Sequence, residues 1–503
     1  VKAELYIKDK VIQELIYITF FSAVLCFLVL WIFSRNIKFV VIVIGSVLIS
    51  VSISFMISQV LFGGIELVMI IMPAILFIVC ISDFMHLVNN AGITKKTSVD
   101  YFKYQINNIG KPVALTSITT AIGFLSFCFS NVLPITRLGF ITTIGILVSL
   151  FVILVTYAIC VDLKLHQIKG SEGINVSVDR LIKVLINFQH SSKSIFLILF
   201  MLFFCMFGIY KFEINNHIHD EFNKSSSLFK EMKFFDKNFG GYKQVSFNFL
   251  NDDNLEIENL IKFEKEIEKL GFTIDRSLFG SFKDLKDLGS LDKKELNIKS
   301  RMPDLGSKES LELFEKVKLI SKKLNIDIQL SGNGYLFDKL SDKITLEILF
   351  GLLMAIITIC LLFLILSNFN FKYLLIVLIP NTFPILVCIG LMSFTNFYFS
   401  LSNAFIFAII FGLIVDDSIH IITSHRFHMK NGLDSKKAID KSLKITGRAV
   451  IKTTLIIIVT LVPLLFSEFN SIGQLGMLTI ISAIIAVVFD LIYLPKMIRN
   501  LVR

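Results

Sequence analysis

The sequence predicts a polytopic α-helical membrane protein, built as a duplicated helical bundle with one extracytoplasmic α+β domain. Three observations predict this fold class. Hydrophobic residues make up 54% of the 503-residue chain, and only 18% of its residues are charged. The mean hydropathy of +0.74 excludes an ordinary soluble protein. Apolar runs that could cross a hydrocarbon core of about 30 Å occur on both sides of one long polar insert.

The apolar runs predict eleven membrane-spanning helices, six before the insert and five after it. We expect them at residues 13–34, 39–62, 66–89, 112–130, 135–162, 194–210, 344–367, 372–396, 401–424, 449–467 and 473–495. An odd number of helices is unexpected in a duplicated protein, and the chain starts at Val1. We therefore expect that an upstream helix and a first polar domain are missing, with residues 1–12 as the end of that domain.

A sequence duplication relates the two groups of helices. Asp417 follows Asp83 at an offset of 334 (417 − 83), and the same offset pairs Asn36 with Asn370. Further along, the offset is 337, and it pairs Gly110 with Gly447, Phe129 with Phe466, and Gly139 with Gly476. Internal symmetry of this kind is a signature of secondary transporters.

Basic residues predict the orientation of the chain. They gather in the loops after residues 89, 162 and 424, and alternation of the helices puts these loops on one side, which is the cytoplasm. The domains are then residues 13–163 (first-half helices), 164–193 (cytoplasmic linker), 194–210 (helix), 211–343 (extracytoplasmic domain) and 344–503 (second-half helices). The net charge of +10 reflects this topology, so membrane lipids are expected partners and nucleic acid is not.

The polar insert reads as a compact α+β domain. Strands are expected at residues 242–250 and 326–331 and helices at 255–270 and 309–324, which fits a ferredoxin-like split βαβ unit. Residues 278–306 are expected to form a loop or hairpin. The insert has no Gly-rich phosphate loop and no nucleophile elbow, so we expect a binding or conduit domain and no enzyme.

A short polar segment at the start of the insert carries residue types that ligate metals, namely His217, His219, Asp220 and Glu221. No further ligand cluster lies nearby in the sequence. A solvated strand or loop is therefore favoured over a metal site. We expect no cofactor and no metal.

An Asp-x-x-His pair lies inside an apolar run of each repeat. The pairs are Asp83 with His86 and Asp417 with His420, and Asp416 precedes the second. A carboxylate in a membrane span costs about 2.5–3.5 kcal/mol at the helix centre and usually marks a functional site. Residues three apart share a helix face, so both pairs would meet at the centre of a pseudo-two-fold bundle. There they could hold and release a proton, and protonation would favour a different packing of the halves.

Other residues in the spans are candidates for supporting roles. The relay could be lined by Thr116, Ser117, Thr453 and Thr454, although such hydroxyls often only satisfy helix backbone. Close helix packing is expected at Gly412, Gly139 and Gly476, and a kink that is either structural or a gate is expected at Pro380, Asn381 and Pro384. The aspartates could instead be structural hydrogen-bonding partners, and the histidines could anchor the membrane interface.

Three sequence segments carry a resemblance to a known family. They are residues 412–420 (GLIVDDSIH), 447–454 (GRAVIKTT) and 238–241 (NFGG). With the helix layout, they resemble exporters of the RND superfamily, most closely the MMPL and hydrophobe/amphiphile efflux branch. The resemblance covers essentially the whole chain, and residues 13–163 are also similar to the sterol-sensing domain.

The resemblance implies an RND-type bundle with a porter domain, in a bacterial inner membrane. It implies proton-driven export of hydrophobic or amphiphilic molecules, with lipids as candidates, and Asp83, Asp416 and Asp417 as the proton relay. Multidrug pumps of the superfamily carry their acid pair on the earlier helix and a Lys on the later one, whereas here the pair is on the later helix. Mycobacterial-type members have Asp-Tyr at both places, but this chain has Phe84 and Ser418. The resemblance is compatible with either a homo-oligomer or a monomer.

Three other functions remain open. A sterol- or lipid-sensing regulator would bind lipid without net flux. An auxiliary subunit of protein translocation would alter secretion and move no small molecule. An intramembrane aspartyl protease built on Asp83 and Asp417 is disfavoured, because the Gly-x-Gly-Asp setting of that chemistry is absent. ATP is not expected as the fuel, because the sequence has no Walker-type loop.

Overall fold

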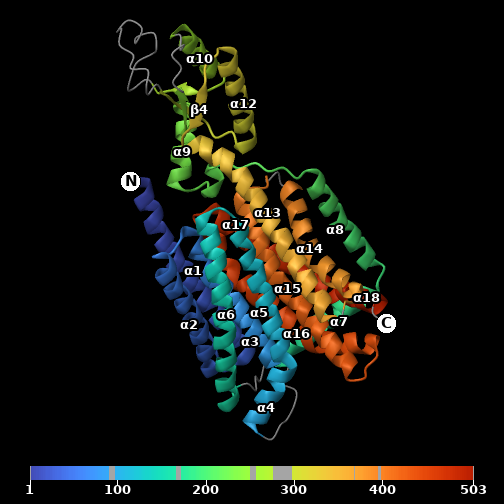
Figure 1. Cartoon of the computed structure of the whole chain (residues 1–503). Helices are drawn as coiled ribbons and strands as arrows, with labels where there is room; N and C mark the ends of the chain where they lie inside the picture. The colour runs from blue at the N-terminus through green and yellow to red at the C-terminus, as the bar shows by residue number, and fades with distance from the viewer. Residues whose placement is uncertain are drawn as a thin grey trace.

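The computed structural model describes residues 2–89, 97–165, 172–249, 257–275, 297–367, 369–394 and 398–501. A bundle of long helices carries a small α+β domain at one end (Figure 1). Eleven of the described helices are long and apolar enough to cross a membrane, and they coincide with the eleven predicted spans. The chain is therefore a multi-pass membrane protein.

The first repeat and the helix after it form the membrane helices before the α+β domain. They are α1 (Lys2–Ser34), α2 (Ile37–Phe62), α3 (Met72–Asn89), α5 (Lys111–Leu125), α6 (Leu133–Asp162) and α8 (Lys193–Tyr210). A 3₁₀ turn, η1 (Leu67–Ile71), leads into α3, and another, η3 (Ser126–Phe129), ends α5. The short helix α4 (Ser98–Gln105) and a π-helical turn (Ile106–Gly110) precede α5.

The second repeat supplies the remaining membrane helices. They are α13 (Asn333–Leu366), α14 (Phe371–Phe394), α15 (Leu401–Lys430), α16 (Ser435–Leu461) and α17 (Asn470–Val488). A 3₁₀ turn, η6 (Val462–Phe466), ends α16. A π-helical turn, η7 (Phe489–Tyr493), joins α17 to the terminal α18 (Leu494–Leu501).

The structure adds detail at two of the predicted segments. The expected cytoplasmic linker 164–193 contains a helix, α7 (Glu172–His190), which packs against α16 and η7. Helix α13 begins at Asn333, upstream of the predicted span at 344–367, because its polar first turns belong to the α+β domain and continue into the membrane without a break. A single rigid helix therefore connects the two parts of the molecule.

The N-termini of the repeat-related helices α2 and α14 have the same local structure. Asn36 caps α2, where its Oδ1 accepts a hydrogen bond of 3.1 Å from the backbone N–H of Lys38. Its repeat partner Asn370 precedes α14 and accepts an equal bond of 3.1 Å from Lys372. A cap of this kind stabilises a helix by about 1 kcal/mol. The duplication thus preserves the same cap in both halves.

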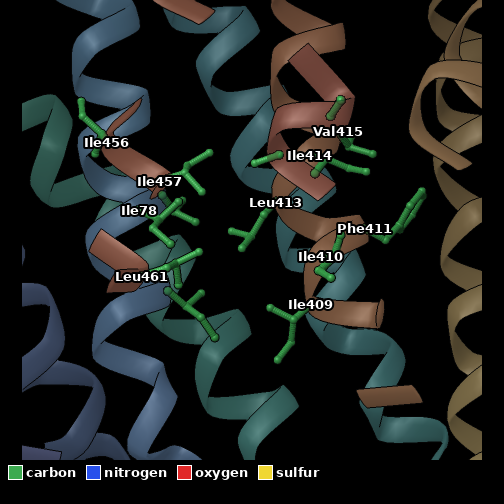
Figure 2. Packing of buried hydrophobic residues seen from close by; sticks show 14 of the residues in the cluster. Ile78, Ile409, Ile410, Phe411, Leu413, Ile414, Val415, Ile456, Ile457 and Leu461 are labelled. Atoms are coloured by element: carbon green, nitrogen blue, oxygen red, sulfur yellow. The ribbon is translucent and has the colours of Figure 1, made fainter. Parts of the chain in front are cut away.

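Helices α3 and α15 lie at the centre of the bundle. In the apolar stretch of each, 94% of the residues are buried, against 22–61% in the other candidate spans. Figure 2 shows part of this core, where Ile78 of α3 lies beside Ile457 and Leu461 of α16, and a row of apolar side chains from Ile409 onwards covers α15. The two helices that carry the Asp-x-x-His pairs are therefore shielded from lipid by the others.

The α+β domain has a four-stranded antiparallel sheet. Its strands are β1 (Lys243–Phe249), β2 (Thr273–Ile274), β3 (Asn297–Met302) and β4 (Ile328–Ser331), in the order β2-β3-β1-β4. Helices α10 (Ile257–Lys269) and α12 (Ser307–Lys323) cover the sheet through a buried apolar core. Both predicted helices and both predicted strands are present. Of the segment 278–306, expected to be a loop or hairpin, residues 278–296 lie outside the described residues, and β3 lies in the remainder. Helix α9 (Ser227–Asn238) was not predicted.

The connection from α9 to β1 explains the Asn-Phe-Gly-Gly segment. Gly241 has φ of 121°, a conformation that favours glycine, and a Cβ atom there would lie 2.0 Å from the carbonyl of Met302. The turn therefore requires glycine for both its backbone conformation and its contact with the end of β3.

Backbone pairing ties the start of the α+β domain to the membrane helices. Ile214 forms a parallel bridge with Phe399, just before α15, and Phe222 forms an antiparallel bridge with Phe469, just before α17. The segment between these bridges thus lies directly on the ends of α15 and α17. These contacts join residues far apart in the sequence, and no local sequence pattern predicts them.

Candidate functional site

Four helices surround the centre of the membrane bundle. The acid-bearing helix α15 packs on α5 of the first half, and the acid-bearing helix α3 packs on α16 of the second half. Because α5 and α16 are repeat partners, each acid-bearing helix packs against the same hydroxyl-bearing helix of the other half. The arrangement fits the pseudo-two-fold symmetry expected from the duplication.

Asp83 is held by two hydroxyl groups of α5. Its Oδ1 accepts a hydrogen bond of 3.2 Å from Thr116 Oγ1, and its Oδ2 accepts one of 2.7 Å from Ser117 Oγ. All three residues are buried. Both predicted lining residues of the first half therefore contact the carboxylate, in place of serving the helix backbone alone.

Asp416 contacts the same helix one turn further along. Its Oδ1 accepts a hydrogen bond of 2.9 Å from Thr120 Oγ1. Close packing allows this approach, because a Cβ atom on Gly123 of α5 would lie 3.0 Å from the Cα of Gly412 on α15. The prediction did not include Thr120, although its place four residues after Thr116 puts it on the same helix face. Helix α5 thus bridges the carboxylates of both halves.

Asp417 turns towards α16 and α3. Its Oδ1 accepts a hydrogen bond of 3.2 Å from Thr453 Oγ1 and lies 3.8 Å from His86 Nε2. Thr453 is the repeat partner of Thr116, so the same hydroxyl serves the same carboxylate in both halves. Thr454 differs from its partner Ser117, because its hydroxyl donates to the backbone carbonyl of Val450 at 2.8 Å.

The two histidines stack on each other at the junction of the halves. The ring centroids of His86 and His420 are 3.6 Å apart, with an angle of 13° between the ring planes. Both side chains are buried, which does not favour the alternative of anchoring at the membrane interface. Since they are repeat partners, their stacking marks the position of the pseudo-two-fold axis.

A further carboxylate, Asp490, was missed in the sequence. It is buried within the π-helical turn η7, and its Oδ1 accepts a hydrogen bond of 2.5 Å from Ser418 Oγ. The Ser418 hydroxyl also lies 3.4 Å from Asn381 Oδ1. An acidic residue inside the apolar run 473–495 already indicates a functional site. It escaped notice because its position in the first repeat is Ile153, so the duplication does not point to it.

The predicted packing and kink residues lie around this cluster. Gly139 packs against Phe127 and Gly476 against Leu464, and both pairs are related by the repeat offset of 337. Pro380 and Pro384 lie inside α14, where Asn381 Nδ2 donates to the backbone carbonyl of Val377 at 2.7 Å. The kink region therefore reaches the acids through the contact between Asn381 and Ser418.

One cavity reaches the histidine pair from the side of the basic loops. It has a volume of about 710 Å³ and is lined by His420, Thr423, Ser424, Lys441, Lys444 and further residues of α4, α15 and α16. Its lining is polar where it meets the loops and reaches the buried ring of His420. This cavity gives the cluster access to the side of the membrane opposite the α+β domain.

The segment considered for metal binding lies at the foot of the α+β domain. His217, His219 and Asp304 bring their ligand atoms within 4.8 Å of one another. The sequence did not indicate Asp304 as a neighbour of these histidines, because it lies far along the chain, in the loop after β3. Lys243 Nζ is 3.2 Å from Asp304 Oδ1 and 2.5 Å from Asp338 Oδ1, so an ammonium already stands beside this carboxylate. The geometry favours a structural charge network over a metal site.

Electrostatics at Asp304 agree with this interpretation. Burial would raise the pKa of the Asp304 carboxyl, but the hydrogen bond from His219 at 2.8 Å and the Lys243 ammonium together hold that pKa below its ordinary value. Tyr242 also donates to Asp304 at 3.0 Å. The network fixes the start of α13 to the sheet, because Lys243 lies on β1 and Asp338 on α13.

Comparison with known proteins finds a family similarity in the second half of the chain. The profile of the MMPL family matches residues 275–498, which include β3, α12, β4 and all the second-repeat helices. The match confirms the predicted resemblance to the MMPL family over these residues. No curated protein matches the chain.

Proposed function

Starting from the match of residues 275–498 to the MMPL family, we propose that the protein is an RND-type transporter that uses a proton gradient to export hydrophobic or amphiphilic molecules. One observation carries the proposal. Asp83 and Asp417, related by the repeat, are buried at the centre of the bundle and accept the same 3.2 Å hydrogen bond from repeat-related threonines. Carboxylates are costly at this depth, which supports a function beyond packing.

Proton transfer would pass through the connected polar groups. On one side, α5 links Asp83 to Asp416 through hydroxyls one helical turn apart. On the other side, Asp417 faces His86, and the stacked His420 lines the cavity towards the basic loops. Protonation of the carboxylates removes buried charge at the contact between the halves. A change in the packing of α3 against α16 and of α15 against α5 is the coupling step.

The α+β domain would act as the extracytoplasmic porter domain. Among the described residues, its elements follow the order β1–α10–β2–β3–α12–β4, and this order and that of the strands in the sheet support a ferredoxin-like split βαβ unit. The basic loops lie at the other end of the bundle, which supports placing the α+β domain outside the cytoplasm of a bacterial inner membrane. Substrate would then enter from the outer leaflet or the external face, near the junction of the domain and the helices.

A hydrophobic cavity at this junction supports an apolar substrate. It has a volume of about 450 Å³ and lies among α6, α15, α17 and the segment at residues 218–222. Cavities of this size hold drug-sized ligands. A lipid sensor could use the same cavity. A measurement of proton flux through the buried aspartates and histidines therefore decides between a transporter and a sensor.

The direct test is proton flux in proteoliposomes that contain the whole protein and a trapped pH-sensitive dye. Candidate lipids and single-chain amphiphiles are added to wild type and to Asp417→Asn. We expect stimulated proton flux in wild type and its loss in the variant. Thr358→Val, an exposed hydroxyl of α13 that bonds only its own helix among the described residues, is a control expected to match wild type. Lipid binding without flux in either protein would reject the pump and favour the sensor.

A further inference from the structure

The cavity between the α+β domain and the membrane helices has a hydrophobic lining that includes one carboxyl group. Most of the residues around it are apolar, among them Ile71, Ile135, Phe222, Phe405 and Leu475. Among its described lining residues, the polar side chains are those of Glu221, Ser402 and Ser471. A single ionisable group therefore stands at the edge of an otherwise hydrophobic space.

The described surroundings of Glu221 give its carboxyl hydrogen bonds but no ion pair. Its Oε1 accepts a hydrogen bond of 2.5 Å from Ser402 Oγ, and Ser471 donates a second one. Burial raises the pKa of Glu221, against the effect of both hydroxyls, and the charge of Asp220 raises it further. Among the described residues, no Lys or Arg forms an ion pair with Glu221. A cation at this point would supply the missing countercharge.

A small polar crevice continues from the cavity at Glu221. The two spaces share Glu221, Phe337, Leu401, Ser402 and Ser471. The crevice is otherwise lined mainly by polar groups, including Asn215, Asn216, His217, Asp220, Asn403 and Gln474. It contains two carboxylates, and the described lining includes no Lys or Arg. Its electrostatic character is therefore negative.

The size of the crevice limits what it can hold. Its volume is about 40 Å³. A water molecule needs about 10–15 Å³ by a comparable measure, so the crevice has room for about three water-sized groups. An ammonium group fits this space, whereas a sugar or a nucleotide does not. A phosphate or sulfate headgroup would stand beside two carboxylates and be repelled.

We propose that the cavity and the crevice together bind a single-chain cationic amphiphile, with its hydrocarbon tail in the cavity and its ammonium group against Glu221. The proposal rests on the proposed function, because it names the class of molecule that the transporter would carry. Glu221 is then the residue that selects the headgroup. The apolar wall supplies affinity for any tail, and the carboxylate discriminates between headgroups.

The test measures binding at the cavity without any transport. The chain has a single tryptophan, so Trp31→Phe combined with Phe405→Trp places the only indole in the cavity wall. The protein is held in nanodiscs of phosphatidylglycerol, which bring no amine of their own. Quenching of the indole is then titrated with 12-bromododecylammonium, 12-bromododecanol and 12-bromododecyl sulfate. We expect the ammonium compound to bind about tenfold more tightly than the alcohol, and the sulfate more weakly than both.

Variants of the carboxylate separate headgroup selection from tail binding. Glu221→Gln should reduce the preference for ammonium to the part that the anionic bilayer causes, and should leave quenching by the alcohol unchanged, which also shows that the cavity is intact. Ser402→Ala, which removes a donor to Glu221, should keep the preference. Glu213→Gln is the matched control, since Glu213 lies at the same junction and pairs with Lys308 at 2.5 Å.

Equal affinities for the three compounds, or an ammonium preference as large in Glu221→Gln as in wild type, would overturn the proposal. The measurement needs no proton gradient. Selective binding in a protein without proton flux would therefore reject the proposed transport and leave the cationic site standing.

Discussion

The carboxylate sites of the two halves have the same scaffold but different chemistry. In the first half, a single acid, Asp83, takes both of its hydrogen bonds from α5, and the next residue, Phe84, packs between Phe39 and Tyr157 at centroid distances of 5.4 and 6.1 Å. In the second half, Asp416 and Asp417 point to different helices. There the next residue is Ser418, whose hydroxyl reaches Asp490.

The difference shows what duplication fixes and what it leaves free. The repeat fixes the position of each acid, its threonine partner and its histidine. The residue after the acid then decides whether the site is closed by aromatic packing, as at Phe84, or connected to a further helix, as at Ser418. We infer that the first-half acid is an end point of the polar chain and that the second half distributes contacts to α5, α16, α3 and η7.

The largest expected effect comes from removing either repeat-related acid. Asp83→Asn and Asp417→Asn keep the shape of the side chain but cannot exchange a proton, so each should lower stimulated proton flux by about 100-fold, a typical contribution of one proton-transfer group. Flux is measured in the proteoliposomes described above. If only one of the two variants loses flux, the equivalence of the halves is wrong.

A smaller effect is expected from the contact that the first half lacks. Asp490→Ala removes the acceptor and Ser418→Ala the donor of the 2.5 Å hydrogen bond between α15 and η7, and each should lower flux by about tenfold, or about 1.4 kcal/mol. Because they break the same contact, the double variant should be no slower than the slower single variant. Additive losses would mean that Asp490 acts apart from Ser418.

The repeat-related threonines sharpen the comparison further. Thr116→Val and Thr453→Val each remove a 3.2 Å hydrogen bond to a carboxylate, and bonds of this kind in membranes contribute about 0.6 kcal/mol. We expect a decrease in flux of about threefold in both variants. The first-half variant should be affected less, because Ser117 still holds Asp83 at 2.7 Å. A larger loss in Thr116→Val would reverse this assignment.

The smallest effect concerns the helix caps. Asn36→Ala and Asn370→Ala should each lower the stability of the protein by about 1 kcal/mol and leave proton flux unchanged, because the caps lie at helix ends away from the acids. Thermal unfolding followed by circular dichroism measures the change. Unequal losses would show that the two halves differ in their scaffold as well as in their chemistry.

Much of this architecture was accessible from the sequence. The lengths of the apolar runs predicted the eleven spans. The duplication indicated Asp83, Asp417 and the two histidines, because a costly polar group that recurs in the apolar runs of both repeats is hard to explain by packing alone. Asp490 was missed since it has no repeat partner. Thr120 and Asp304 were missed because their importance depends on which distant segments pack against them, and that information is tertiary.

The central claim is that the acids of both halves act as one proton relay. The most direct measurement compares stimulated proton flux in wild type, Asp83→Asn, Asp417→Asn and the double variant, all in the same proteoliposomes. We expect that both single variants lose flux and that the double variant loses no more, because the effects of groups that act as a unit are not additive. Full flux in Asp83→Asn, or independent losses that multiply in the double variant, would contradict it.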